Sequence, residues 1–276
     1  MPRPAPPGVR LGIVEPQDAV NAFLRRDLLL PSFRWQDVWQ QEHLRGFAVA
    51  GVMRHDILQL MYDELGVAIQ AGATAGAFVK RARQRLAERG FWGNVEVTDP
   101  ATGEVRTTRF NDGRLRLIHD TNLGQAYAVG QAERFARTKQ YLPWLRYSTK
   151  GDDQVRESHA AWDNVTLPHD HPWWATHRPM KAWRCRCTVA QLSQRQYERL
   201  LAAGKIKTKP PADVMVDQLD PRTGETLRLP RGVDAAFAYD ATARPLRSLT
   251  PPPLLADPLD RRAAARATTD AGPAMP

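Results

Sequence analysis

Residue types that bind metals are concentrated in one short stretch, residues 167–187, which reads LPHDHPWWATHRPMKAWRCRC. This stretch contains both cysteines of the chain and three of its seven histidines. Zinc in proteins is held by about four ligands, commonly cysteine sulfur and histidine nitrogen, in a tetrahedral arrangement. His169 and His171 are two residues apart, as are Cys185 and Cys187, so in extended segments each pair faces one side. One zinc ion could therefore lie between the two pairs.

A metal-free packing of the same residues is the competing interpretation. Cysteines of structural zinc motifs are separated by roughly two to four residues, whereas this chain has a single Cys-x-Cys pair. Buried free cysteines behave as small apolar groups, and four tryptophans between positions 162 and 183 supply bulk around them. We predict a metal-free core without a cofactor. Zinc is kept as the alternative, with these candidate ligands: His159, His169, His171, Cys185 and Cys187.

Catalytic residues are harder to single out than metal ligands. Cys185, His159 and Asp163 supply the residue types of a nucleophilic Cys-His-Asp site, but a chain of this length supplies such a trio by chance. Carboxylates between residues 152 and 170 are of the type that binds magnesium, although turn capping and pairing with arginine account for them equally well. No glycine-rich phosphate-binding loop of the Walker or Rossmann type occurs. We predict that the protein is not an enzyme, with a zinc- or magnesium-dependent hydrolase as the alternative.

Composition and charge narrow the class of protein. The 276 residues are 42% hydrophobic and 25% charged, which is ordinary for a globular protein. No apolar run is long enough to cross a bilayer, and the first residues lack the apolar core of a secretion signal. We therefore expect a cytoplasmic protein without a membrane partner, in which two cysteines form no disulfide framework.

The positive charge of the chain favours polyanionic partners. Lysine and arginine number 39 against 30 acidic residues, which gives a net charge of +9, and nucleic acid is the first partner that such an excess suggests. One expected helix carries a basic run on its polar side. Such a run is usually a solvated helix face, yet it is the best candidate here for contact with DNA phosphates or an acidic partner. Its residues are Lys80, Arg81, Arg83, Arg85 and Arg89.

Helical patterns dominate residues 15–140. Pro16 suits the first turn of a helix that we expect to end at Pro31. Apolar residues spaced by three or four between positions 47 and 68 predict one amphipathic helix.

The next elements follow from caps and turns. Thr74 predicts the N-cap of a helix that stops at Gly90. Alternating residues around a Pro-x-Thr-Gly turn predict a β-hairpin near 95–110. A long helix follows at 113–135, where small residues at positions 124 to 130 permit close packing against another element.

The pattern changes in residues 141–240, where short strands and turns dominate. Ser193 and Gln196 predict a capping box at the start of a helix at 193–203. A second hairpin is predicted around DPRTGE, residues 220–225. The fold class is therefore α+β, with a helical N-terminal half that includes a β-hairpin and a smaller, β-containing C-terminal half. We expect a flexible Pro-rich arm at 1–14 and a disordered tail at 241–276.

Four sequence blocks in this order resemble the phage Mu F-like minor head proteins of the phage head-morphogenesis family. They are EPQDAVNAFLRRDLLLPSFRWQDVWQQEHLRGFAVAGVM, LIHDTNLGQAYAVGQAERF, DDQVRESHAAWDNVTLPHDHPWW followed by WRCRC, and RGVDAAFAYDAT. The family often has glycine near the turn at Asp163, where this chain has Asn164. Because asparagine tolerates the left-handed backbone conformation, we expect the turn to persist.

The resemblance implies a minor structural or assembly protein of a tailed-phage head. Its implied partners are the portal protein and the capsid or scaffold proteins, and double-stranded DNA is a further candidate. The implied location is the host cytoplasm during assembly and then the virion, inside the head or at the portal vertex. The alternative is a metal-dependent enzyme or a nucleic-acid-binding accessory protein that acts during DNA packaging. Six residues of the family blocks are expected to be structural: Arg156, His159, Asp163, Trp183, Cys185 and Cys187.

Overall fold

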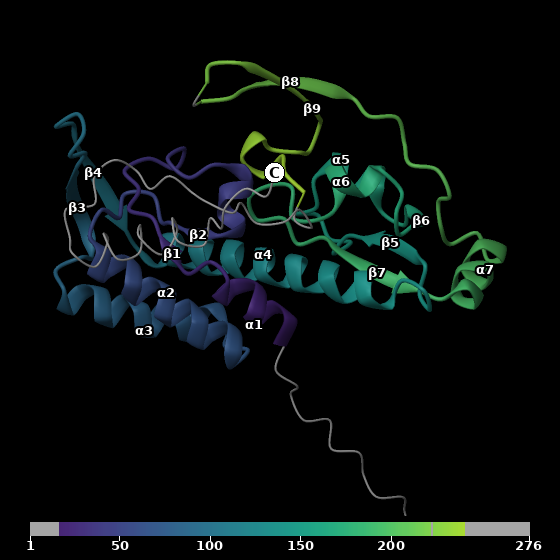
Figure 1. Ribbon diagram of the computed structural model, residues 1–276, viewed down its shortest axis with the longest axis horizontal. Helices are drawn as coiled ribbons and strands as arrows, with labels where there is room; N and C mark the ends of the chain where they lie inside the picture. The colour runs from purple at the N-terminus through teal and green to yellow at the C-terminus, as the bar shows by residue number, and fades with distance from the viewer. Residues whose placement is uncertain (1–16, 222, 241–276) are drawn as a thin grey trace, which may run out of the picture.

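A computed structural model describes residues 17–221 and 223–240, and the predicted arm and tail lie outside this part of the chain (Figure 1). The described residues form helices together with several small sheets, which confirms the predicted α+β class. None of the described helices is both long enough and apolar enough to span a membrane. The α-helices are α1 (Gln17–Leu24), α2 (His55–Gln70), α3 (Ala75–Glu88), α4 (Asp112–Thr138), α5 (Glu157–Trp162), α6 (Trp173–His177) and α7 (Gln194–Ala202). The strands are β1 (Leu28–Leu29), β2 (Gly46–Phe47), β3 (Gly93–Thr98), β4 (Val105–Phe110), β5 (Trp144–Ser148), β6 (Thr166–Pro168), β7 (Thr188–Leu192), β8 (Met215–Leu219) and β9 (Thr226–Pro230), and the 3₁₀ helices are η1 (Gln40–Leu44) and η2 (Ala235–Phe237).

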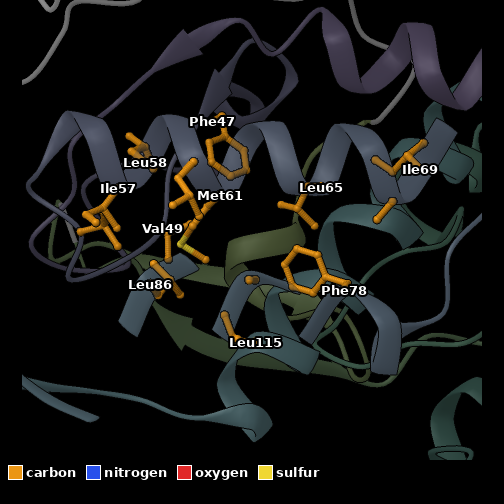
Figure 2. Packing of buried hydrophobic residues seen from close by; sticks show 14 of the residues in the cluster. Phe47, Val49, Ile57, Leu58, Met61, Leu65, Ile69, Phe78, Leu86 and Leu115 are labelled. Carbon is orange, nitrogen blue, oxygen red and sulfur yellow. The ribbon is translucent and has the colours of Figure 1, made fainter. Parts of the chain in front are cut away.

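Helix α4 runs along the length of the molecule (Figure 1). Helix α3 packs against its N-terminal turns, and α1 packs against its middle and C-terminal turns. The cap predicted for α3 is present, because the Thr74 hydroxyl oxygen accepts the Ala77 N–H at 3.3 Å. Side chains from α1, α2, α3 and α4 fill the first hydrophobic core, in which Met61, Leu65 and Phe78 are fully buried (Figure 2). The predicted hairpin is formed by β3 and β4 and lies at the end of this helical layer.

Two boundaries expected in the N-terminal half are wrong. Helix α1 ends at Leu24 and not at Pro31, because the leucines that follow form the buried strand β1, which pairs in parallel with β2. The apolar stripe between positions 47 and 68 is not one helix either. Gly51 has φ +71°, a left-handed conformation that interrupts a helix, and α2 begins only at His55.

The C-terminal half is built on the three-stranded antiparallel sheet β6–β5–β7, with α5 and α6 packed nearby (Figure 1). Its hydrophobic core is rich in aromatic rings, among them Tyr147, Trp162 and Trp173. The predicted capping box is present in α7, where Ser193 and Gln196 exchange hydrogen bonds of 3.2 and 2.8 Å. The second predicted hairpin is formed by β8 and β9, and next to its turn the Gly224 N–H donates to the Asp220 carbonyl oxygen at 2.8 Å.

The turn at Asn164 keeps the backbone expected from the family resemblance. Asn164 has φ +65°, and its side-chain oxygen accepts the Arg146 Nε–H at 2.9 Å. The carboxylate of Asp163 accepts the Thr149 N–H at 2.7 Å and the Asn164 side-chain N–H at 2.8 Å. Side-chain hydrogen bonds thus hold the turn that joins α5 to β6.

Candidate functional site

His159 is the centre of the candidate site, and α5 presents it to the interior of the C-terminal half. Its side chain is almost fully buried, and its ring stacks on Trp162 three residues later, with the ring centroids 4.7 Å apart. The His159 Nε2 lies 2.9 Å from the Gly232 carbonyl oxygen. Because a carbonyl oxygen only accepts, Nε2 carries the proton, and Nδ1 of the neutral ring is left with a free lone pair.

Both cysteines face this lone pair. The Sγ atoms of Cys185 and Cys187 lie 3.7 and 3.5 Å from His159 Nδ1. The hydrogen bond between the two thiols lowers the pKa of Cys185, whereas the same contact, together with burial, raises the pKa of Cys187. Burial, together with the nearby cysteines, raises the pKa of the Tyr147 hydroxyl well above its ordinary value.

Gly232 brings its carbonyl oxygen to His159 through a close backbone approach. Gly232 has φ +104°, and a Cβ atom added there would lie 2.4 Å from Ser158 Oγ and 3.0 Å from the His159 ring. Any other residue here would have a strained backbone conformation, and its Cβ atom would crowd the side chains of Ser158 and His159. The carbonyl that fixes the orientation of His159 therefore depends on glycine at 232.

The other histidines proposed as zinc ligands are placed elsewhere. His169 Nδ1 lies 3.0 Å from the Asp170 carboxylate, and His171 Nδ1 accepts the Trp173 N–H at 3.1 Å. Among the described residues, the group of three with metal-ligand spacing contains His159 and the two cysteines, whose ligand atoms lie within 4.8 Å of one another. The proposed pairing of the His-x-His and Cys-x-Cys segments around one ion is therefore not seen.

The Cys-His-Asp trio is also not assembled as a catalytic triad. The carboxylate of Asp163 accepts hydrogen bonds from Thr149 and Asn164. The His159 ring is instead oriented by the hydrogen bond between its Nε2 and the Gly232 carbonyl oxygen. Two further residues of the family blocks contact each other, since Arg156 Nη2 donates to the Trp183 carbonyl oxygen at 2.6 Å. These contacts join loops around the cysteines.

A large groove opens beside the cysteines, with a volume of about 1210 Å³. It is bounded by residues of α1 and α4 on one side and by the loop that carries the cysteines on the other. Its wall carries the carboxylates of Asp18 and Asp120 and four arginine side chains, which are Arg134, Arg156, Arg184 and Arg186. One of these arginines is neutralised, because Arg186 forms two hydrogen bonds of 2.6 Å with Asp152.

The basic run predicted on α3 is largely paired within the chain. Arg81 and Arg85 lie 3.0 and 2.5 Å from the two carboxylate oxygens of Glu64, whose side chain is 6% exposed. Arg83 lies 3.8 Å from Asp112 and also over the ring of Trp92. The arginines thus hold α3 to α2 and α4, and Lys80 and Arg89 are the remaining members of the predicted contact surface.

His177 predicts a dependence of stability on pH. Its side chain is 1% exposed and its ring stacks on Trp173, while Nε2 lies 3.0 Å from Asp213. Burial lowers the pKa of His177 below 6.5, although Asp213 opposes the shift. The unfolded chain therefore binds more protons than the folded chain in acid, and the free energy of unfolding should fall as the pH drops below about 6.5.

Urea unfolding of His177→Gln and of the wild type between pH 5 and pH 8 would measure this effect. We expect the wild type to lose more stability than the variant on going to the acidic end. His171→Gln, in a partly exposed histidine of the same segment, is the matched control and should follow the wild type. Equal pH dependence in the wild type and His177→Gln would contradict the assignment.

Two site residues were not predicted from the sequence. Tyr147 lies on β5 beside the cysteines, and its only sequence signal is the alternation of a short strand. Gly232 belongs to the block RGVDAAFAYDAT that resembles the family, and a glycine inside such a block is the signal that could have indicated a close backbone approach.

Comparison with known proteins gives a family. Residues 59–190 match the family model described as Phage Mu protein F like protein. The chain is 29% identical over 185 residues to the putative capsid assembly protein F of Escherichia phage Mu, which covers 67% of this chain and 42% of that protein. It is 28% identical over 198 residues to the Mu-like prophage FluMu F protein of Haemophilus influenzae, which covers 71% of this chain and 47% of that protein.

The chain spans less than half the length of these two curated relatives. No solved structure gives a significant match. The matched residues include the long helix α4, the helix that carries His159 and both cysteines. The family match and the two relatives together show that residues 59–190 of the chain are similar to the phage Mu F-like proteins.

Proposed function

We propose that this chain is a structural protein of phage head morphogenesis. The main support is the match of residues 59–190 to the Mu F-like family. The similar protein of Escherichia phage Mu is named as a putative capsid assembly protein. We propose that the chain is a low-copy component of the head, which associates with capsid or scaffold proteins close to the portal vertex. It acts in the host cytoplasm during assembly and then remains in the particle.

The contacts of the family residues support a structural role. Arg156, Asp163 and Trp183 are engaged in hydrogen bonds that fix loops, and the Cys-His-Asp trio lacks the contact between carboxylate and imidazole that nucleophilic catalysis uses. A chain built in this way contributes a fixed surface to an assembly. We therefore propose assembly and not catalysis as its activity.

Contact with DNA is a second part of the proposal. The net charge of +9 supports it, but the Glu64 carboxylate bridges Arg81 and Arg85 and so cancels one of their two positive charges. Arg134, Arg156 and Arg184 on the wall of the groove beside the cysteines are the other candidates for contact with phosphates. Binding of duplex DNA should weaken steeply as salt rises if phosphates are contacted, and absence of binding at low salt would remove DNA from the proposed partners.

Deleting the gene for this chain from its phage or prophage tests the proposed function. We expect few normal heads in electron micrographs of the induced lysate, and restoration of normal heads when the full chain is supplied from a plasmid. Quantitative mass spectrometry of purified particles should find the chain in far fewer copies than the major capsid protein. Normal, infectious heads from the deletion strain, together with absence of the chain from wild-type particles, would contradict the proposal.

A further inference from the structure

Three side-chain atoms, His159 Nδ1, Cys185 Sγ and Cys187 Sγ, lie close enough together to bind one zinc ion. With Zn–S near 2.3 Å and Zn–N near 2.0 Å, tetrahedral angles require sulfur and nitrogen ligands to be about 3.6 Å apart. The observed distances from His159 Nδ1 are 3.7 Å to Cys185 Sγ and 3.5 Å to Cys187 Sγ. Both nitrogen-to-sulfur distances are therefore at ligand spacing, and all three ligand atoms lie within 4.8 Å of one another.

The orientation of His159 also fits a metal ligand. A histidine bound to a metal through one nitrogen almost always donates its other N–H to a carbonyl or a carboxylate, which fixes the tautomer and the ring orientation. His159 Nε2 makes this hydrogen bond, at 2.9 Å from the Gly232 carbonyl oxygen. The close approach of Gly232 to α5 builds the contact into the backbone, so the Nδ1 lone pair is aimed at the two sulfur atoms.

The chemistry of the three atoms selects among metals. Two thiolates and one imidazole are soft and borderline ligands that suit zinc, whereas magnesium and calcium prefer oxygen. Zinc with two thiolates is electrically neutral, which suits a buried position. Cys185 and Cys187 also line the groove, so a fourth position is accessible to water from that side.

We propose that His159 Nδ1, Cys185 Sγ and Cys187 Sγ bind one zinc ion, with a water molecule from the groove as the fourth ligand. The ion joins α5 to the loop before β7, and through His159 it also fixes the segment at Gly232. These three segments are far apart in the sequence, so zinc binding cross-links them and stabilises the folded C-terminal half. The site differs from the pairing suggested by the sequence, because His169 and His171 take no part.

Metal analysis of the full chain, purified under reducing conditions with zinc supplied, tests the proposal. We expect about one zinc per chain, and loss of most of it in Cys185→Ser, Cys187→Ser and His159→Ala. His169→Ala and His171→Ala are matched controls, since both histidines belong to the same region but lie outside the cluster, and both variants should keep the zinc. A zinc-free wild type, or zinc lost in either control variant, would overturn the assignment.

A second measurement on the unmutated protein removes the ambiguity of variants that fail to fold. Cobalt(II) exchanged into the site should give an absorption spectrum with thiolate-to-cobalt charge transfer and the strong visible bands of four-coordinate cobalt. Zinc should also protect both thiols from alkylation, and a chelator should expose them. A cobalt spectrum without thiolate bands, or thiols that alkylate equally fast with and without zinc, would show that the cluster is a metal-free packing contact.

Discussion

Replacing Gly130 by alanine should destabilise the fold by about 3 kcal/mol, because the added methyl group has no room. A Cβ atom at this position in α4 would lie 2.5 Å from the Asp18 carbonyl carbon and 2.6 Å from the Ala19 nitrogen. These are backbone atoms of α1, so no side chain can rotate away. The two helices would have to separate along a contact that buries Ala19 and other apolar side chains.

The clash reverses the sign of the expected change in the free energy of unfolding. Alanine is favoured over glycine in a helix interior by roughly 0.5–1 kcal/mol, so without the clash the substitution would stabilise the protein. Gly66→Ala is the matched control, since Gly66 lies inside α2 and also faces α1. Its added methyl group would meet only a ring carbon of Phe23, at 3.7 Å, which is ordinary contact.

Urea unfolding followed by circular dichroism measures both variants. Gly66→Ala should have the stability of the wild type or slightly more, and Gly130→Ala should unfold at much lower urea. In the deletion strain, Gly66→Ala should restore head assembly, whereas Gly130→Ala should restore it poorly. Equal stability of the two variants would mean that α1 does not pack against α4 as closely as the structure shows.

Local signals in the sequence were sufficient for the elements that depend on local chemistry. The cap at Thr74, the capping box of Ser193 and Gln196, and both hairpin turns depend on residues within one turn of each other, and each was predicted correctly. The small residues of α4 also indicated close packing, which the contact between Gly130 and α1 confirms.

The errors arose where tertiary structure decides the local conformation. Short apolar runs fit a buried strand and a helix equally well, and Leu28–Leu29 becomes a strand because Gly46–Phe47 lies beside it. The spacing of apolar residues across Gly51 imitated a helix, although this glycine adopts a left-handed conformation. Periodicity alone cannot detect either effect.

Tertiary structure also decides which residues meet in the candidate site. The sequence indicated a group of histidines and cysteines, but it paired His169 and His171 with the cysteines because they are neighbours in the chain. The structure instead brings His159 to the cysteines, 26 and 28 residues away, and Gly232 to His159 over 73 residues. Such long-range closure depends on how α5 packs on the sheet, which no local pattern encodes.

The packing of α5 depends above all on Trp162, and Trp162→Ala should cost about 3–5 kcal/mol of folding free energy. The indole is 4% exposed and contacts other rings on several sides. The ring centroids of His159 and His177 both lie 4.7 Å from it, and those of Tyr147 and Trp173 lie 5.8 and 6.3 Å away. Removing the indole would leave a cavity in the middle of the second core, and the surrounding rings are too rigid to fill it.

Trp35→Ala is the control, because Trp35 is 46% exposed and its ring contact is with Trp39. We expect Trp35→Ala to cost less than about 1 kcal/mol, since little apolar surface returns to water. Chemical denaturation of both variants, with Trp162→Phe as an intermediate that retains a ring, should rank them in the order of buried ring area. Because Trp162 also supports the His159 ring, its loss should loosen the cluster of His159, Cys185 and Cys187 and speed alkylation of both thiols. If Trp162→Ala unfolds at the same urea concentration as Trp35→Ala, the aromatic cluster does not hold the C-terminal half together, and the positioning of His159 must come from the Gly232 contact alone.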